Sequence, residues 1–224
     1  MEVLMKKIFW ILPGIILLTA CSTAVTQTPS ADIPLLPTLQ ADTAQPTPAQ
    51  PAILPTESES DVSISDLLAN LPAPNCGSGL TPENQAGPYF KAGSPQTNTF
   101  YLEGMEGTRL ILVGQVVNQD CFPFPNVKVD FWQTDANGEY DNEGYLFRGH
   151  QFTDNKGRYY LDTVIPGLYS SRPIQHIHVT LTSPSGEEVT TQLYFPDQPV
   201  DNLTVQLEDR GDYFVGYFTF VMQD

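Results

Sequence analysis

Short runs in which apolar and polar residues alternate fill the second half of the chain, which is the period of half-buried β-strands. The run VKVDFWQ at 127–133 shows this alternation, and it predicts a strand with one apolar face. The run RLILVGQVV at 109–117 is apolar on both faces, as a buried strand is. Turn-forming residues bound further runs. The predicted strands are 109–117, 127–133, 158–164, 175–182, 189–195 and 213–222.

No long helical period interrupts these strands, and the pattern favours only one short helix, within 61–71. Closely spaced strands separated by turn-forming residues indicate an all-β fold, an antiparallel β-sandwich or barrel with irregular loops and little helix. We expect this domain to occupy residues 72–224.

The N-terminus reads as an export signal. Two lysines at positions 6 and 7 precede an apolar run at 8–18, which is shorter than the roughly 20 residues a spanning helix needs. A membrane helix is therefore the weaker interpretation. The next residues, Leu-Thr-Ala-Cys, resemble the lipobox of bacterial lipoproteins, which implies a signal peptide over 1–20 and lipidation of Cys21.

Residues 21–71 are rich in Pro, Thr, Ala and Gln and nearly free of aromatic side chains. Such a segment cannot bury enough apolar surface to offset the entropy of ordering, so we expect a disordered tether. The predicted product is an exported lipoprotein, anchored to a membrane of the cell envelope through Cys21 and facing the periplasm or the exterior.

Charge narrows the possible partners. The chain has 10 Lys and Arg against 26 Asp and Glu, a formal net charge of −16. This charge repels phosphate backbones and anionic headgroups, so we expect no nucleic-acid partner, and membrane attachment through the lipid alone. The two cysteines besides Cys21 are Cys76 and Cys121, and an oxidising compartment favours a disulfide between them over two separate buried thiols.

Candidate chemistry lies between positions 135 and 192. His176 and His178 share one face of a predicted strand about 6–7 Å apart, close enough to bind one metal ion, while Ile177 faces the core with its apolar neighbours. Tyr140 and Tyr169 precede this pair in turn contexts. Each tyrosine taken alone would more often be a packing residue, and a histidine pair at this spacing without other signals is more often not a ligand pair. The four residues are therefore candidates for a metal site, which their order in a family motif would support.

The motifs GPYF, WQTDANGEY, RGHQFTDNKGRYYLDTVIPGLY, HIHV and TTQLYF follow one another in that order. Together they resemble the intradiol ring-cleavage dioxygenases, the family of catechol 1,2-dioxygenases and protocatechuate 3,4-dioxygenases. The resemblance runs from about Leu80 to Phe195 and is strongest to compact exported members, which lack a helical dimerisation segment. It implies a β-sandwich core.

The resemblance also implies a cofactor, non-haem Fe(III). Its ligands would be Tyr140, Tyr169, His176 and His178, and two phenolates with a hydroxide would balance the charge of this hard cation. Tyr169 would leave the metal when substrate binds and take up a substrate proton. His150, the third histidine, does not fall on one of the family's ligand positions, and we expect it in a loop or beside the ligands.

Further residues around the metal follow from the same resemblance. Gln192 would bind substrate or polarise an intermediate, with an ordinary strand amide as the alternative. Arg172 would stabilise carbanion character, although it lies one residue farther from His176 than the family spacing, so a surface loop arginine is an equal alternative. Tyr89 and Trp132 are candidates for the substrate pocket, with plain packing favoured for Trp132.

The expected reaction is the insertion of both atoms of O2 into a small aromatic diol, cleaving the ring between its two hydroxylated carbons to a cis,cis-muconate-type product. A non-catalytic, lipid-anchored β-sandwich that binds a ligand or partner in the cell envelope is the alternative from another class. A metalloenzyme of different chemistry using the same ligands is a third.

Overall fold

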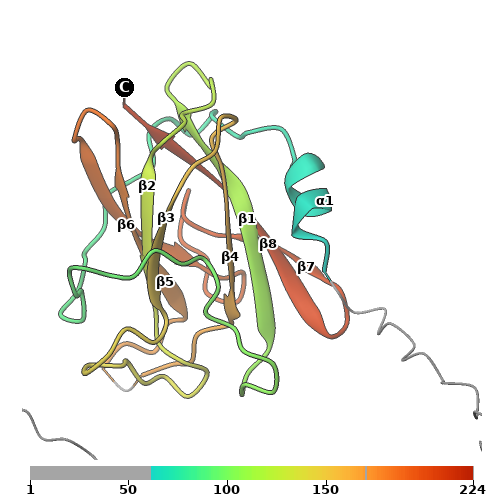
Figure 1. The fold of residues 1–224 in the computed structure, drawn as a ribbon, viewed down its shortest axis with the longest axis vertical. Coiled ribbons are helices and arrows are strands. Elements are labelled where there is room, and N and C mark those ends of the chain that lie inside the picture. Colours follow the sequence, from blue (N-terminus) through green and yellow to red (C-terminus); the bar gives the residue numbers. More distant parts are fainter. Residues whose placement is uncertain (1–61, 170, 224) are drawn as a thin grey trace, which may run out of the picture. The chain divides into compact units, whose positions relative to one another are not determined.

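The structure is a computed structural model that describes residues 62–169 and 171–223. The predicted signal peptide 1–20, Cys21 and the tether as far as residue 61 lie outside the described residues. The described part contains one short helix and eight strands (Figure 1). They are α1 (Ile64–Ala69), β1 (Arg109–Asn118), β2 (Lys128–Trp132), β3 (Arg148–Phe152), β4 (Arg158–Val164), β5 (His176–Thr182), β6 (Glu188–Tyr194), β7 (Gln206–Asp209) and β8 (Tyr213–Met222).

The strands form two four-stranded sheets, with the orders β4-β1-β8-β7 and β3-β2-β5-β6. Side chains from the facing sides of both sheets make one core, which confirms the all-β sandwich. The pairing of β1 with β8 is parallel, whereas every other pair of named strands is antiparallel. Sequence alternation reports which face of a strand is buried and not its partner or direction, so this pairing could not be predicted from it.

The β5 strand has the orientation that its sequence predicts. Ile177, Val179 and Leu181 are fully buried in the core between the sheets. His176 and His178 therefore point to the other face of the second sheet. Both histidines are nevertheless 3% exposed or less, because loops cover that face.

The same loops correct the prediction of a half-buried strand at 127–133. Asp130 and Trp132, on its polar face, are both buried in β2. Ser94 donates a hydrogen bond to Asp130, and Phe90 packs edge-on against Trp132, so the segment before β1 covers this face. The chain that covers a strand can come from far away in sequence, and alternation does not report it.

Two strands, β3 and β7, were not predicted. Both are short, both lie at a sheet edge, and their sequences, RGHQF and QLED, are largely polar. These strands are defined by backbone hydrogen bonds to a neighbouring strand. They lack the alternation of apolar and polar residues from which a strand can be predicted.

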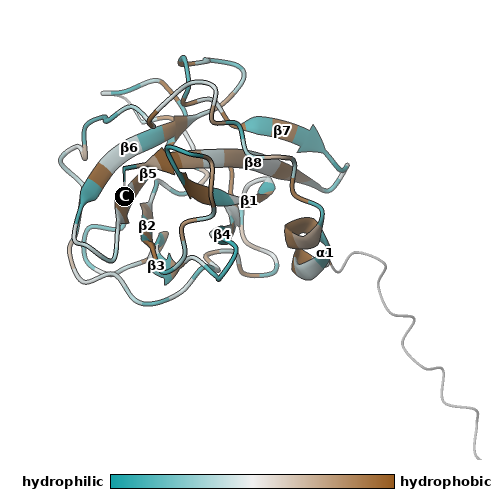
Figure 2. Ribbon diagram, turned by 90° about the horizontal axis from the view of Figure 1, so that it is seen from above, coloured by the Kyte–Doolittle hydropathy of each residue, from teal (hydrophilic) through white to brown (hydrophobic). Residues whose placement is uncertain are grey.

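The outer face of the first sheet carries a smaller cluster of Ile111, Val113 and Val215, against which the apolar residues of α1 pack. The helix begins where the Ser63 hydroxyl accepts a hydrogen bond from the Asp66 amide. The apolar bands of α1, β1 and β8 are visible in Figure 2. The packed region thus includes residues before 72, the expected start of the domain.

A disulfide joins Cys76 to Cys121, with a Cα–Cα distance of 5.9 Å. It ties the segment that follows α1 to the turn after β1. Within the described residues, none of the helical structure is long and apolar enough to cross a membrane.

Candidate metal centre

The candidate centre is built on the outward face of the β5–β6 pair. His176 lies opposite Tyr194 and His178 lies opposite Gln192 in the register of the two strands. Because residues i and i+2 share a face, these four side chains stand together on one face of the sheet. All four are buried.

The two imidazoles converge on one point. Their Nε2 atoms are 3.1 Å apart. The Nδ1 of His176 lies 2.7 Å from the carbonyl oxygen of Ile174, and since a carbonyl only accepts, Nδ1 carries the proton and Nε2 offers a lone pair. Burial lowers the pKa of His176, and burial together with neighbouring His176 and Arg172 lowers the pKa of His178 to about 2. Both rings are thus neutral, as metal ligands must be.

Tyr140 approaches this point from the connection between β2 and β3. Its hydroxyl is buried and has no hydrogen-bond partner among the described residues. Burial, and next the nearby Tyr169, raise the pKa of this hydroxyl. A buried hydroxyl without a protein partner is uncommon, and an oxygen left free in this way is available to bind a metal ion.

Tyr169 completes the group. Its ring centroid lies 5.7 Å from that of Tyr140 and 6.0 Å from that of His176, and Tyr140 lies 6.4 Å from His178. The structure thus brings Tyr140, Tyr169, His176 and His178 together from three segments, and we call them the four-ring group. Within the part of the chain that the structure describes, no three or more His, Cys, Asp or Glu side chains form a metal-binding group. Among the described residues, the two tyrosines are what extends the histidine pair to a candidate set of four ligands.

A tight turn before Tyr140 positions this tyrosine and contacts the loop that carries Tyr169. The Asp135 carboxylate accepts hydrogen bonds from the amides of Asn137 and Glu139, which shapes the turn before Tyr140. Gly138 in this turn has a positive φ of 84°, and a Cβ there would lie 2.0 Å from the carbonyl oxygen of Leu168. The loops that carry Tyr140 and Tyr169 therefore touch backbone to backbone, at a position where only glycine fits.

Arg148, in β3, is a part of the site that sequence reasoning missed. Its buried guanidinium donates to the carbonyl oxygens of Tyr89 and Asp141, and it lies 5.7 Å from the centroid of the Tyr140 ring. An arginine in a predicted loop gave no signal, because its partners are backbone carbonyls of remote segments. Arg148 thus connects the segment of Tyr89, whose ring stacks on Tyr140, to Asp141, the residue that follows Tyr140.

The predicted pocket residues Tyr89 and Trp132 both contact candidate ligands. Tyr89 stacks on Tyr140 with centroids 4.3 Å apart, and Trp132 stacks on His178 at 4.9 Å, the planes inclined by 4°. Trp132 is 2% exposed, so its buried ring covers one face of the His178 imidazole. Gly87 closes the side of the same histidine, since a Cβ there would lie 3.4 Å from His178 Cε1.

Arg172 and Gln192 also lie at this face. The Arg172 Nη2 donates to the Tyr194 hydroxyl at 2.9 Å. Burial raises the pKa of Tyr169, and the charge of Arg172 offsets part of this rise. A tight turn, in which the Ile174 amide donates to the Arg172 carbonyl, accommodates the additional residue before His176. His150 instead bonds to the Ser94 hydroxyl through Nδ1 at 3.0 Å, away from the four-ring group.

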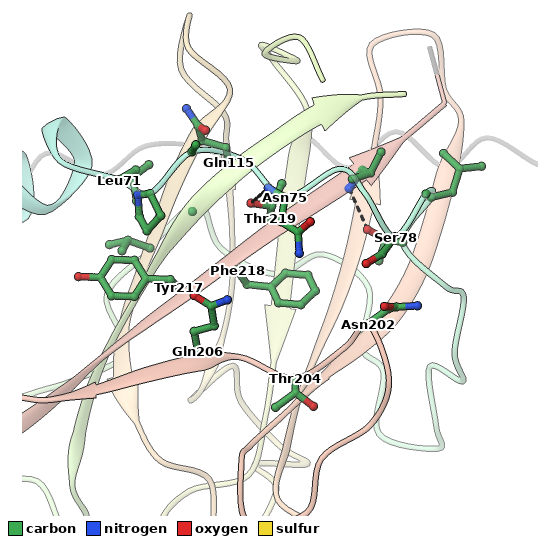
Figure 3. A pocket seen from close by; sticks show the side chains of 18 of the residues that line it. Leu71, Asn75, Ser78, Gln115, Asn202, Thr204, Gln206, Tyr217, Phe218 and Thr219 are labelled. Atoms are coloured by element: carbon green, nitrogen blue, oxygen red, sulfur yellow. Dashed lines mark hydrogen bonds between the residues drawn. The ribbon is translucent and has the colours of Figure 1, made fainter. Parts of the chain in front are cut away.

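A cavity of about 270 Å³ elsewhere is lined by residues of β1, β8 and the segment after α1 (Figure 3). Gln115, Tyr217 and Thr219 are among its lining residues, and none of the four candidate ligands is. It lies against the first sheet, whereas the histidines belong to the second. The candidate ligands and this cavity therefore belong to different parts of the fold.

Known proteins resemble this chain in sequence and in structure. The sequence signature of a family described as Dioxygenase matches residues 85–206. The protocatechuate 3,4-dioxygenase beta chain of Burkholderia cepacia is 32% identical over 112 residues, which are 42% of this chain and 47% of that protein. The chain spans about half the length of the curated relatives it matches.

Solved structures resemble the chain as well. The dioxygenase domain of a dioxygenase carbohydrate-binding protein fusion from Streptomyces sp. SirexAA-E has a TM-score of 0.62 and 39% identity, covering 64% of this chain and 98% of that one. The 3-chlorocatechol 1,2-dioxygenase of Rhodococcus opacus 1CP has a TM-score of 0.59 and 28% identity, covering 66% and 74%.

Proposed function

Because the chain belongs to the intradiol dioxygenase family, we propose that it is a non-haem Fe(III) enzyme that inserts both atoms of O2 into a catechol-type diol and cleaves the ring between the hydroxylated carbons. The observation that carries this proposal is the buried, unpartnered Tyr140 hydroxyl beside two neutral imidazoles and a second tyrosine.

Tyr140, Tyr169, His176 and His178 would hold the iron. Their two phenol oxygens and two imidazole nitrogens suit a hard trivalent cation, because anionic oxygen ligands offset its charge. When bound, the iron would activate the catecholate for attack by O2.

The two tyrosines differ in how firmly they are held, and this difference supports separate roles. Tyr140 lies under the Tyr89 ring, and Arg148 anchors the chain beside it. Tyr169 follows the exposed Leu168 in a loop and faces Arg172. We therefore assign the displaceable position to Tyr169, whose phenolate oxygen would accept a proton from the incoming diol, while Tyr140 stays in place.

Arg172 and Gln192 would act on the bound diol. The guanidinium brings positive charge beside the ring as electron density builds on it, and the Gln192 amide offers a hydrogen bond at the same face. Export with lipidation at Cys21 remains part of the proposal, and the Cys76–Cys121 disulfide supports it, since such bonds persist in oxidising compartments.

Oxygen consumption with catechol tests this proposal. We expect the iron-loaded protein to consume one O2 per ring and, under ¹⁸O2, to place label from both atoms in a muconate-type product. His178→Ala should abolish turnover and iron binding, whereas His150→Ala should retain both because His150 lies away from the four-ring group. A folded, iron-loaded protein that cleaves no catechol would overturn the proposal and favour the envelope binding module.

A further inference from the structure

Tyr194, at the end of β6, forms hydrogen bonds with both Arg172 and Gln192 at the candidate centre. It lies opposite His176 in the β5–β6 register, is 2% exposed, and its ring centroid is 6.2 Å from that of His176. Its hydroxyl receives hydrogen bonds from Arg172 Nη2 at 2.9 Å and Asn84 Nδ2 at 3.0 Å, and it donates to Gln192 Oε1 at 2.9 Å.

This arrangement uses the whole hydrogen-bonding capacity of the hydroxyl. A phenol has one proton and two lone pairs, and a guanidinium can only donate. With both lone pairs occupied by N–H groups, the single proton of Tyr194 goes to Gln192 Oε1. The other end of that amide, Nε2, donates to the carbonyl oxygen of Gln85. Both ends of the Gln192 amide are therefore fixed, and one Nε2 proton remains beside His178.

The same hydroxyl holds Arg172, which lies in the loop that contains the additional residue before His176. Arg172 is half-buried, and its backbone pairs with that of Tyr169 in the preceding turn. An arginine side chain has many rotamers, and each contact that fixes the guanidinium removes some of that freedom. The bond to Tyr194 connects this guanidinium to the sheet that carries both histidines.

We infer that Tyr194 is a positioning residue, whose hydroxyl holds Arg172 and Gln192 in their catalytic orientations and compensates for the shifted spacing of Arg172. This inference rests on the proposed function. Asn84 assists by filling the second lone pair, so that the Tyr194 proton is directed to Gln192. A tyrosine serving only to pack would need the ring and not the hydroxyl.

Tyr194→Phe separates these two roles, since it keeps the ring and removes all three hydrogen bonds. In the iron-loaded full chain we expect kcat for catechol to fall tenfold or more, while iron content stays at the wild-type level. Combined with Arg172→Ala, the tyrosine substitution should cost clearly less than it does alone, because the two residues act as one unit. Tyr217→Phe is the matched control: its hydroxyl bonds to Glu208 on the first sheet, and kcat should not change.

A second measurement does not depend on turnover. In the metal-free protein, the side-chain amide resonances of Gln192 and Asn84 in ¹H–¹⁵N spectra should shift in Tyr194→Phe and stay in place in Tyr217→Phe. An active wild type with kcat within twofold in Tyr194→Phe, or unmoved amide resonances, would overturn this inference alone. An iron-loaded wild type without ring cleavage would overturn the proposed function and this inference together.

Discussion

Tyr140→Phe should change the stability of this protein in opposite directions with and without iron. In the metal-free protein the Tyr140 hydroxyl is buried without a partner among the described residues. A buried, unsatisfied polar group costs about 1–3 kcal/mol, so removing the oxygen while keeping the ring should stabilise the metal-free fold by about that amount. For a domain of this size, each kcal/mol shifts the Tm by about 2–4 °C.

Tyr159→Phe is the matched control. Tyr159 is also buried, but its hydroxyl donates to the carbonyl oxygen of Phe218 at 3.0 Å. Its removal leaves an acceptor unsatisfied and should destabilise the fold by about 1 kcal/mol or more. The two variants delete the same atom from the same residue type, so the sign of their effects separates an orphan hydroxyl from a paired one.

The assay is thermal unfolding in the presence of a chelator, followed by the same melt after iron loading. We expect Tyr140→Phe to melt above the wild type without iron. After loading, the wild type should gain stability by binding the metal in its folded state, and the variant should gain far less. A metal-free Tyr140→Phe that melts below the wild type, as Tyr159→Phe does, would refute the reasoning.

Two further predictions concern stability. The folded-state pKa of both histidines lies below the usual value of about 6.5, so the unfolded chain binds protons that the folded metal-free protein does not. Urea unfolding should therefore show that stability decreases as the pH is lowered below about 6.5, by up to about 1.4 kcal/mol per pH unit per histidine. His178→Gln should reduce this slope, and an unchanged slope would contradict the conclusion that both histidines are neutral. Reducing the Cys76–Cys121 disulfide should cost about 2–5 kcal/mol, seen as a lower urea midpoint with dithiothreitol than without, and an unchanged midpoint would contradict a structural role.

Much of the grouping of the candidate ligands could be predicted because its signals are local. The alternation of β5 separates the histidines from the buried Ile177, and the turn glycines mark the loops of both tyrosines. The contributions that escaped prediction are interactions between remote segments. Arg148 bonds to the carbonyls of Tyr89 and Asp141, and the parallel pairing of β1 with β8 joins positions about a hundred residues apart.

Arg172 illustrates the same limit. From its spacing alone, Arg172 is equally compatible with a place in the site and a place on the surface, because a shifted spacing does not show where a flexible side chain is held. The contact that places it comes from Tyr194, on a strand with no sequence feature linking the two. Side-chain anchors of this kind require the three-dimensional register of β5 against β6.

The visible spectrum of the purified full chain, with metal analysis on the same sample, tests the central claim most directly. Two phenolate ligands on Fe(III) should give a broad charge-transfer band at about one iron per chain. The band should move to longer wavelength when catechol is added without oxygen, and it should be lost in Tyr140→Phe. A correctly folded protein that stays colourless after incubation with iron would contradict the account.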